Sequence, residues 1–448
     1  MGDILKGSPL VSDARPASHE GSTAEPVVAG TAVANTTGTG YLSEFDLIES
    51  KYSITGADFD KIIPLRKNYS EVYGKTWSRA SGAGCVGYCE ISYGTDTSIN
   101  VNATFLGISL DSPKYVYKFE IFYSYTNQLG TSSEIFVERN GDYIFSLIPI
   151  RRMSTGFYKS TLNFKWYRKT QNGSEWTLSN NITVPLYNFP LKPTSPWSKI
   201  KGEKNNPWTA VLDLLWDKSI NNPKNYEIRY QTMPNQISKA ITYIVNSKLG
   251  LVYDTDGGGR TQFGSGTYDL TDFLKCLNGT STTNLYRNKR VINCTDCARA
   301  VTTFANLLGC NLFNVVFGYT VGFRCNKVMT LGADIWDYPF SDGTEGWFGY
   351  HEISMVETYA YTSNIYDACL KVNTNVIKNG QDISRSSLLP TKTRFSSRSD
   401  YPKITGKPDY PYISANDAQY YIEWLVYNDR IHFNNAKLYR NRGTMQIE

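Results

Sequence analysis

Histidine is the scarcest ionisable residue of this sequence. The chain of 448 residues has only three, His19, His351 and His432. Imidazole is the side chain that most often acts as a base near neutral pH. Few positions of this chain can therefore supply that chemistry, and any site that needs a histidine must use one of these three.

Long apolar segments and clustered charge are also missing. No apolar run approaches the ~18 residues of a membrane span, so none is expected. The N-terminal stretch MGDILKGSPLVSDARPASHEG has no apolar core, so we expect a cytoplasmic protein, or one exported by an apparatus that needs no signal peptide. The net charge of +5 is spread without a basic stripe, which makes nucleic acid an unexpected partner.

The first half of the chain is predicted to be β-structure. Residues 1–40 consist mainly of small and polar residues, and we expect a flexible tail there. Residues 41–190 have period two: in YVYKFEIFYSY the alternate residues from Tyr115 to Tyr125 are apolar. Asn140-Gly141 and Asn172-Gly173 are typical of hairpin turns. Together these features predict an antiparallel β-sandwich.

In the second half of the chain the spacing of the apolar residues changes from alternation to a helical pattern. After a Pro-rich linker at 191–205, helical spacing begins in NNPWTAVLDLLWDKS, where Asn206 is the expected N-cap and Pro207 the first helical residue. Residues 206–375 are predicted to form an α+β domain. Residues 376–448 form an extension that we expect to pack on this domain, ending in a helix over NDAQYYIEWLVYNDR.

Two cysteines precede a predicted helix in VINCTDCARAVTTFANLLGC. The apolar spacing after Cys297 indicates a helix that ends at Gly309, with Thr295 or Asp296 as its cap. This places Cys297 in the first turn, where the helix dipole favours a thiolate, and Cys294 one step outside the helix.

Metal binding, redox exchange and nucleophilic attack are the three chemistries open to this pair. A zinc site needs a second Cys or His pair, and no metal or cofactor is expected here. A redox C-x-x-C pair is a weak signal by itself. Nucleophilic attack requires a base and a group that orients it. His351 in GWFGYHEISMVETYAY and Asp367 in NIYDACLKV lie on two successive predicted strands and fit these roles.

The order Cys–helix, His–strand, Asp–strand resembles the transglutaminase-like superfamily of papain-like cysteine enzymes, over roughly residues 205–375. TDCARAVTTFANLLG is similar to the family's cysteine segment, with an acidic residue before the nucleophile and Leu-Gly closing the helix. The resemblance implies a triad of Cys297, His351 and Asp367, with the Cys297 backbone N–H as the generic oxyanion donor. Ile353 and Ala368 depart from the family pattern.

The expected function is that of a cysteine-dependent enzyme acting on amide bonds of a protein or peptide: a protease, amidase, deamidase or transglutaminase. An alternative is a non-enzymatic binding or structural module of a phage-like or contractile particle, with a degenerate domain. A third possibility is an effector or toxin loaded into a delivery apparatus through the N-terminal tail. Whether the cysteines form disulfides stays open.

Overall fold

The structure of the chain is a computed structural model. It describes residues 40–49, 62–89, 99–149, 156–197, 203–255, 261–281, 290–318, 321–335, 337–340, 346–356, 364–372, 393–394, 425 and 439–448. Helices and strands both occur, as expected for an α+β protein. The predicted tail at 1–40 lies outside the described residues except for Gly40.

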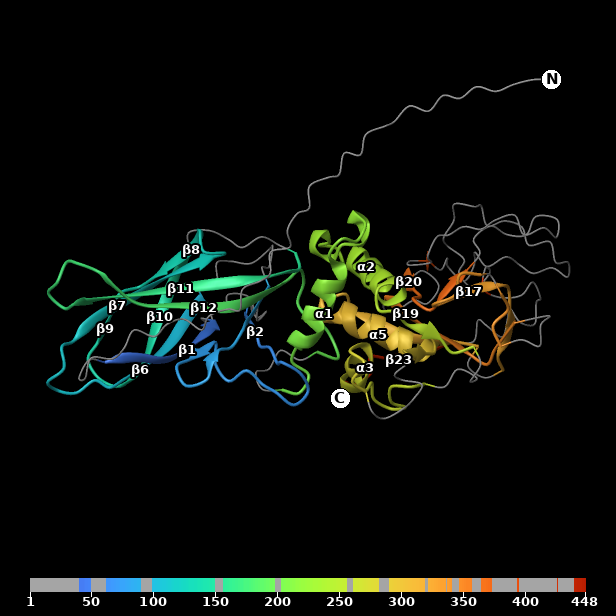
Figure 1. The fold of residues 1–448 in the computed structure, drawn as a ribbon, viewed down its shortest axis with the longest axis horizontal. Helices are drawn as coiled ribbons and strands as arrows, with labels where there is room; N and C mark the ends of the chain where they lie inside the picture. Colours follow the sequence, from blue (N-terminus) through green and yellow to red (C-terminus); the bar gives the residue numbers. More distant parts are fainter. Residues whose placement is uncertain are drawn as a thin grey trace, which may run out of the picture.

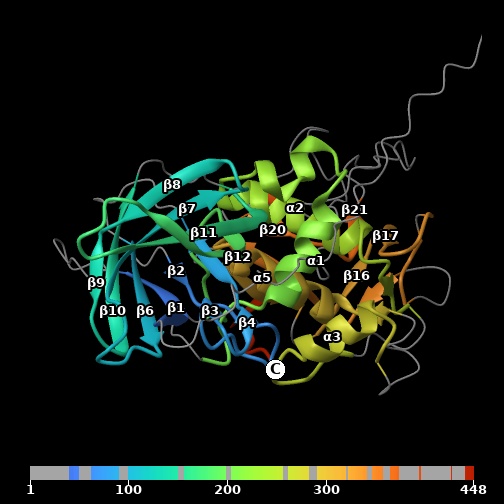
Figure 2. The ribbon, with the colours of Figure 1, turned by 60° about the vertical axis from the view of Figure 1, so that its left-hand side comes forward.

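A large curled sheet occupies one end of the molecule (Figures 1 and 2). Its strands are β1 (Tyr41–Glu49), β2 (Ile62–Ile63), β3 (Trp77–Ser78), β4 (Gly82–Ala83), β5 (Val86–Cys89), β6 (Ile99–Leu106), β7 (Tyr115–Tyr123), β8 (Asn127–Ser132), β9 (Ile135–Val137), β10 (Gly141–Pro149), β11 (Tyr158–Thr170) and β12 (Thr177–Phe189). They run in the order β2-β5-β12-β11-β7-β8-β10-β6-β1-β3-β4, and β9 also pairs with β7. The curl encloses one apolar core.

The period-two pattern of β7 has the expected structural meaning. Tyr117, Phe119 and Ile121 are buried in the curled sheet, while the residues between them are more exposed. Phe119 packs against Trp166 of β11, with ring centroids 4.8 Å apart. Such aromatic contacts add stability beyond the area they bury.

One of the two predicted hairpins is wrong. β11 and β12 pair antiparallel across Asn172-Gly173, as predicted. At Asn140-Gly141, however, the flanking strands do not pair with each other: β9 pairs with β7, and β10 pairs with β6 and β8. The turn dipeptide marks a reversal correctly, but strand pairing is set by the long-range partners.

The other end of the molecule holds the helices and a second sheet. Its helices are α1 (Thr209–Ser219), η1 (Lys224–Tyr226), η2 (Ile228–Tyr230), α2 (Pro234–Ser247), α3 (Leu270–Leu277) and α5 (Cys294–Leu307). Its strands are β13 (Val252–Tyr253), β14 (Val291–Ile292), β15 (Leu312–Phe317), β16 (Phe323–Cys325), β17 (Val328–Thr330), β18 (Gly346–Phe348), β19 (His351–Val356), β20 (Asn364–Tyr366), β21 (Leu370–Val372), β22 (Thr393–Arg394) and β23 (Tyr439–Gly443).

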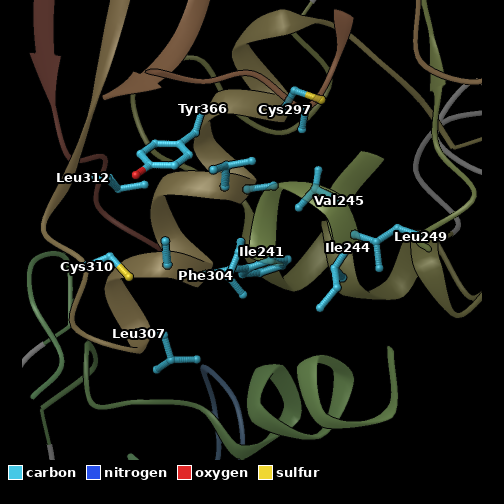
Figure 3. Close-up of a cluster of buried hydrophobic side chains, with 14 of the residues drawn as sticks. Ile241, Ile244, Val245, Leu249, Cys297, Phe304, Leu307, Cys310, Leu312 and Tyr366 are labelled. Atoms are coloured by element: carbon cyan, nitrogen blue, oxygen red, sulfur yellow. The ribbon is translucent and has the colours of Figure 1, made fainter. Parts of the chain in front are cut away.

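The helix α5 is central to this half. The sheet β22-β20-β19-β15-β23 is antiparallel throughout, and α5 packs against β19 and β15. The helix α2 packs against α5, and apolar side chains such as Ile241 and Phe304 fill the space between the two helices (Figure 3). Every residue of α5 is buried.

The Pro-rich segment after β12 is tied to α5. The backbone N–H of Thr194 donates to the Asn306 carbonyl over 2.9 Å, and the Trp197 indole donates to the Thr303 carbonyl over 2.8 Å. One apolar cluster also extends from Ile63 in the curled sheet into the helices. The described part of the predicted linker is therefore packed structure that joins the two ends.

Two details of the second half differ from the sequence prediction. The helix α1 begins at Thr209, with Trp208 as its N-cap, rather than at Pro207 with Asn206 as cap. The C-terminal extension contributes the strand β23, which pairs with β15. The helix predicted over 416–430 lies outside the described residues, apart from Leu425.

In the part of the chain that the structure describes, no helix has the length and apolar character needed to cross a membrane.

Candidate active site

The helix α5 begins two or three residues earlier than its predicted cap, Thr295 or Asp296. Asn293 is the N-cap: its side chain accepts from the Asp296 backbone N–H over 3.0 Å. The Asp296 carboxylate accepts in return from the Asn293 N–H over 3.3 Å, which completes a capping box. Thr295 and Asp296 are thus inside the helix. Cys294, predicted to lie outside, is its first residue.

Asp296 also fixes the loop that precedes α3. Its carboxylate accepts from the backbone N–H groups of Gln262, at 2.9 Å, and of Phe263, at 3.2 Å. Burial raises the pKa of Asp296 to about 6, against the opposing effect of these donors and of Arg299. The Arg299 guanidinium donates to the Gly264 carbonyl over 2.5 Å, so the loop is held from two positions of the helix.

We expect Asp296→Ala to lower the free energy of unfolding by about 3 kcal/mol or more, because buried N–H donors then lose their acceptor at ~1–3 kcal/mol each. Asp269→Ala is the matched control, since this carboxylate caps α3 through one donor, the Asp272 N–H, and a lost cap costs ~1 kcal/mol. Urea unfolding of both variants measures the difference. Equal losses would show that Asp296 is no more than a helix cap.

Cys297 does not contact the imidazole through any interaction that the structure shows. Its side chain is 1% exposed and belongs to the buried apolar cluster around α2 and α5 (Figure 3). Burial raises the pKa of the Cys297 thiol, and a hydrogen bond with the Cys369 thiol opposes this only in part. Desolvation is the largest of these effects, and the raised pKa opposes the thiolate that a place in the first helical turn would favour.

The backbone N–H of Cys297 is not an oxyanion donor either. It donates to the Asn293 carbonyl over 3.1 Å, the first hydrogen bond of the helix ladder. The N–H of Cys294 lies at the first helical position, where a backbone donor has no acceptor within the helix. The Cys297 N–H, predicted as the generic oxyanion donor, is thus already used within the helix, whereas the Cys294 N–H is not.

Cys294 is the cysteine that faces the histidine. Its thiol lies near the His351 imidazole and the Tyr253 hydroxyl, and it raises the pKa of both groups. Tyr253 reaches this position because β13 pairs in parallel with β14, which places Tyr253 beside Ile292, two residues before Cys294. Burial raises the pKa of Tyr253 well above its usual range, so the phenol keeps its proton and can donate it.

His351 and Asp367 are joined by a direct hydrogen bond. The Nε2 atom of His351 lies 2.9 Å from Oδ2 of Asp367, and the two side chains are 0% and 1% exposed. With Nε2 bonded to Asp367, the Nδ1 atom is the ring nitrogen that remains for Cys294. Prediction placed these two residues on neighbouring strands, and β19 and β20 are indeed paired, with Asp367 following the last residue of β20.

The charge of Asp367 favours a protonated His351. Burial alone lowers the pKa of His351, but the Asp367 charge and hydrogen bond outweigh it and raise that pKa from 6.5 to about 10. A histidine with a raised pKa stabilises the fold fully below about pH 6.5, and this contribution is lost as the pH rises through about 10. At neutral pH the site therefore holds an imidazolium beside Cys294.

Asp367 is held in place by the turn that follows it. Its Oδ1 atom accepts from the backbone N–H groups of Cys369, at 2.8 Å, and Leu370, at 3.3 Å. The Cys369 thiol donates to the same oxygen over 3.1 Å. These donors leave Oδ2 directed at the imidazole, and they stabilise the ionised carboxylate.

A second carboxylate supports the site from the other face of β19. Glu352 accepts from the Thr295 hydroxyl, at 2.9 Å, and from the Arg442 guanidinium, at 3.0 Å. Burial raises the pKa of Glu352, and Arg442 opposes this shift. Since Thr295 follows Cys294 and Glu352 follows His351, this contact fixes the helix start against the strand. The C-terminal strand β23 thus helps to hold the site together.

The described residues contain one group whose donors could hold a metal ion. One ligand atom each from His351, Asp367 and Cys369 lie within 4.8 Å of one another, all buried. Nitrogen, oxygen and sulfur donors suit Zn²⁺. In this arrangement, however, Nε2 and Oδ2 are joined directly by their 2.9 Å hydrogen bond, so the pair is already satisfied without an ion.

The structure thus brings His351 and Asp367 together as expected, with the Cys369 thiol bonded to Asp367 and the Cys294 thiol near the imidazole. Sequence reasoning missed Tyr253, Cys369 and Arg442, whose roles depend on contacts between distant segments. Only the capping box Asn293–Asp296 left a local signal, an Asn followed three residues later by an acid. Comparison of the chain with protein-family models and with curated protein sequences finds no match.

Proposed function

We propose that the chain is a cysteine-dependent enzyme that transfers acyl groups from amide bonds, with Cys294 as its nucleophile, His351 as its base and Asp367 as the group that orients the base. The observation that supports this most is the position of the His351 imidazole, which is hydrogen-bonded to the Asp367 carboxylate over 2.9 Å and lies near the Cys294 thiol. A nucleophile, a base and a fixed carboxylate in this order are the parts that acyl transfer requires.

In the proposed reaction Cys294 attacks the substrate carbonyl as a thiolate, stabilised by the adjacent imidazolium. The tetrahedral intermediate collapses when His351 gives its proton to the leaving nitrogen. Water or an amine, deprotonated by His351, then attacks the thioester and releases the acyl group. Asp367 holds the imidazole in one orientation throughout, because its own position is fixed by the turn at Cys369.

Tyr253 is proposed to stabilise charge at the reacting centre. Its hydroxyl is a buried donor already directed at the Cys294 sulfur, and the carbonyl oxygen of a bound substrate would lie next to that sulfur. We propose the Cys294 backbone N–H, at the first position of α5, as the second donor. Preorganised donors of this kind act where negative charge develops.

We expect Tyr253→Phe to lower kcat/KM about 10²-fold, because one donor to the developing charge is removed. The ring is retained, so its contact with Phe340, at 5.8 Å between centroids, should hold the fold. Tyr268→Phe is the matched control: this tyrosine is equally buried, and its hydroxyl has no hydrogen-bond partner among the described residues. Steady-state hydrolysis of p-nitrophenyl acetate gives the comparison. Equal rates in the two variants would remove Tyr253 from the mechanism.

The reaction class is tested by rapid mixing with p-nitrophenyl acetate, followed by peptide substrates. A burst of one p-nitrophenolate per chain and an acetyl group on Cys294 are expected. Ammonia release from glutamine peptides, cleavage of the backbone, and incorporation of an added amine then separate deamidase, protease and transglutaminase. Absence of any acyl-enzyme would favour the non-enzymatic binding or particle module.

The arrangement of elements supports a finer proposal about the fold. We infer a β-sandwich in the curled sheet and a transglutaminase-like domain in the second half, because α5, β19 and the turn after β20 carry the cysteine, histidine and aspartate in the order of that superfamily. A protein or peptide substrate fits this proposal. Delivery as an effector or toxin through the N-terminal segment remains part of it, and secretion assays with that segment deleted are the test.

A further inference from the structure

The aromatic rings beside the triad form a connected layer with one member at its outer edge. The Phe348 ring lies 5.2 Å from the His351 ring between centroids. The Phe340 ring packs on Phe348 at 5.7 Å and on Tyr253 at 5.8 Å. Tyr253 and Phe348 are buried, whereas Phe340 is only half-buried. Phe340 is therefore the ring of this layer that also faces solvent.

The backbone at Phe340 has an unusual conformation. Its φ angle is +56°, in the left-handed region that a bulky side chain rarely adopts. The segment before it is anchored, because Asp337 and Val328 exchange two backbone hydrogen bonds of 2.9 Å. The Pro339 carbonyl also accepts from the Trp347 N–H over 3.1 Å. Strained conformations persist where the surrounding structure holds them, and they cluster at sites that bind ligands.

Tyr253 and Phe348 hold the Phe340 ring in a geometry that suits an aromatic group. The planes of Phe340 and Phe348 meet at 81°, edge to face, and those of Phe340 and Tyr253 at 56°. Aromatic pairs favour tilted and edge-to-face arrangements at these separations. The two buried rings thus offer favourable contacts to a third ring, and one of them packs beside the imidazole.

We propose that Tyr253 and Phe348 form a substrate subsite that binds an aromatic side chain next to the reacting amide, and that Phe340 occupies this subsite until the substrate displaces it. The inference rests on the proposed function for the amide beside the ring. The affinity of the subsite for an aromatic ring does not depend on turnover, so the two proposals can fail separately.

An exchange of rings also gives the substrate a route to the triad. Cys294 and His351 are 4% and 0% exposed, too little for a substrate carbonyl to reach them in this arrangement. Phe340 is the half-buried ring of the layer, so its side chain can turn towards solvent without crossing the core. An aromatic side chain of the substrate then restores the ring contacts that Phe340 gives up.

The test measures binding of phenylacetamide, which carries a phenyl ring one carbon from an amide, to the full chain by ligand-observed NMR titration. Phe340→Gly removes the competing ring, and glycine adopts a positive φ readily. We expect this variant to bind phenylacetamide at least ~10-fold more tightly than the wild type, because a buried phenyl ring contributes more than that factor. Acetamide, which lacks the ring, should bind both proteins equally.

Trp347→Ala is the matched control and should bind phenylacetamide like the wild type. It removes an aromatic ring from the residue before Phe348, at a side chain that is 42% exposed, and keeps the backbone hydrogen bond to Pro339. Phe340→Ala is a second variant that retains a Cβ atom at the position, and it should bind as Phe340→Gly does. Circular dichroism of each variant checks that its fold is retained.

The same titrations in the Cys294→Ser background separate this proposal from the proposed function, since binding needs no thiol. Tighter binding of phenylacetamide after removal of the Phe340 ring supports the subsite even in a protein without turnover. The subsite is overturned if phenylacetamide binds the Phe340 variants no more tightly than the wild type, or if acetamide gains as much affinity as phenylacetamide.

Discussion

Replacing Cys294 with serine is expected to reduce p-nitrophenyl acetate turnover by at least ~10³-fold and to abolish the acyl-enzyme, as the loss of a nucleophile does in other triads. The physical reason is that a serine hydroxyl is far harder to ionise than a thiol, even beside an imidazolium. The fold should persist, because the exchange of sulfur for oxygen leaves the capping box of Asn293 and Asp296 untouched.

Cys297→Ser is the matched control for this experiment. It makes the same chemical change three residues along the same helix, at a sulfur that contacts Cys369 rather than His351. Turnover within about threefold of the wild type is expected, with some loss of stability from the hydroxyl placed among apolar side chains. If Cys297→Ser is inactive and Cys294→Ser is active, the nucleophile is Cys297. Equal loss in both would indicate that the cysteines act as a unit, as in a metal or disulfide-exchange site.

Replacing Asp367 with asparagine is the second large effect. We expect kcat/KM to fall by roughly 10³- to 10⁴-fold, since an amide can hold the imidazole in the wrong tautomer. The loss of the carboxylate charge should also lower the pKa of His351 from about 10, because that charge is what raises it. A less populated imidazolium stabilises the Cys294 thiolate less, so the rate of Cys294 alkylation at pH 6 should also fall.

Asp272→Asn is a suitable control for the loss of a buried carboxylate elsewhere. This residue lies in α3 and is 7% exposed. Its carboxylate accepts from the hydroxyl of Ser281, which follows the helix, over 2.9 Å. Its activity and its alkylation profile should match those of the wild type. An unchanged pH profile in Asp367→Asn, with activity intact, would show that a different group orients His351.

Sequence reasoning could predict α5, β19 and β20 because each has a local signal. It could also predict His351 and Asp367 as members of the site. Apolar spacing predicted α5, and alternation predicted the strand that begins at His351. The choice between Cys294 and Cys297 was not accessible in the same way. Since all residues of α5 are buried, its pattern has no solvent face from which to deduce which side meets the histidine.

The error at the helix start had a specific cause. Thr295 and Asp296 are both good caps, and the acid at the third helical position drew the cap assignment two or three residues too far along the chain. Asn293 satisfies the same rule and adds the reciprocal bond from Asp296. With Asn293 as the cap, Cys294 is the first residue of the helix. The Cys297 N–H then donates to the Asn293 carbonyl, as the first backbone hydrogen bond of the helix.

The remaining parts of the site depend on pairings between distant segments. Tyr253 is placed by its parallel pairing with β14, and Arg442 arrives from a strand near residue 440. Neither segment has a motif that points to the cysteine. Such contacts follow from tertiary packing, which local periodicity does not determine.

The most direct test of the central claim is the rate at which each cysteine of the unmodified protein reacts with iodoacetamide at pH 6. Brief labelling followed by peptide mapping assigns a rate to every thiol. The proposed site predicts that Cys294 reacts at least ~10-fold faster than the other cysteines, because an imidazolium near this thiol favours its thiolate. Faster labelling of Cys297 than of Cys294, or equally slow labelling of both, would contradict the proposed site.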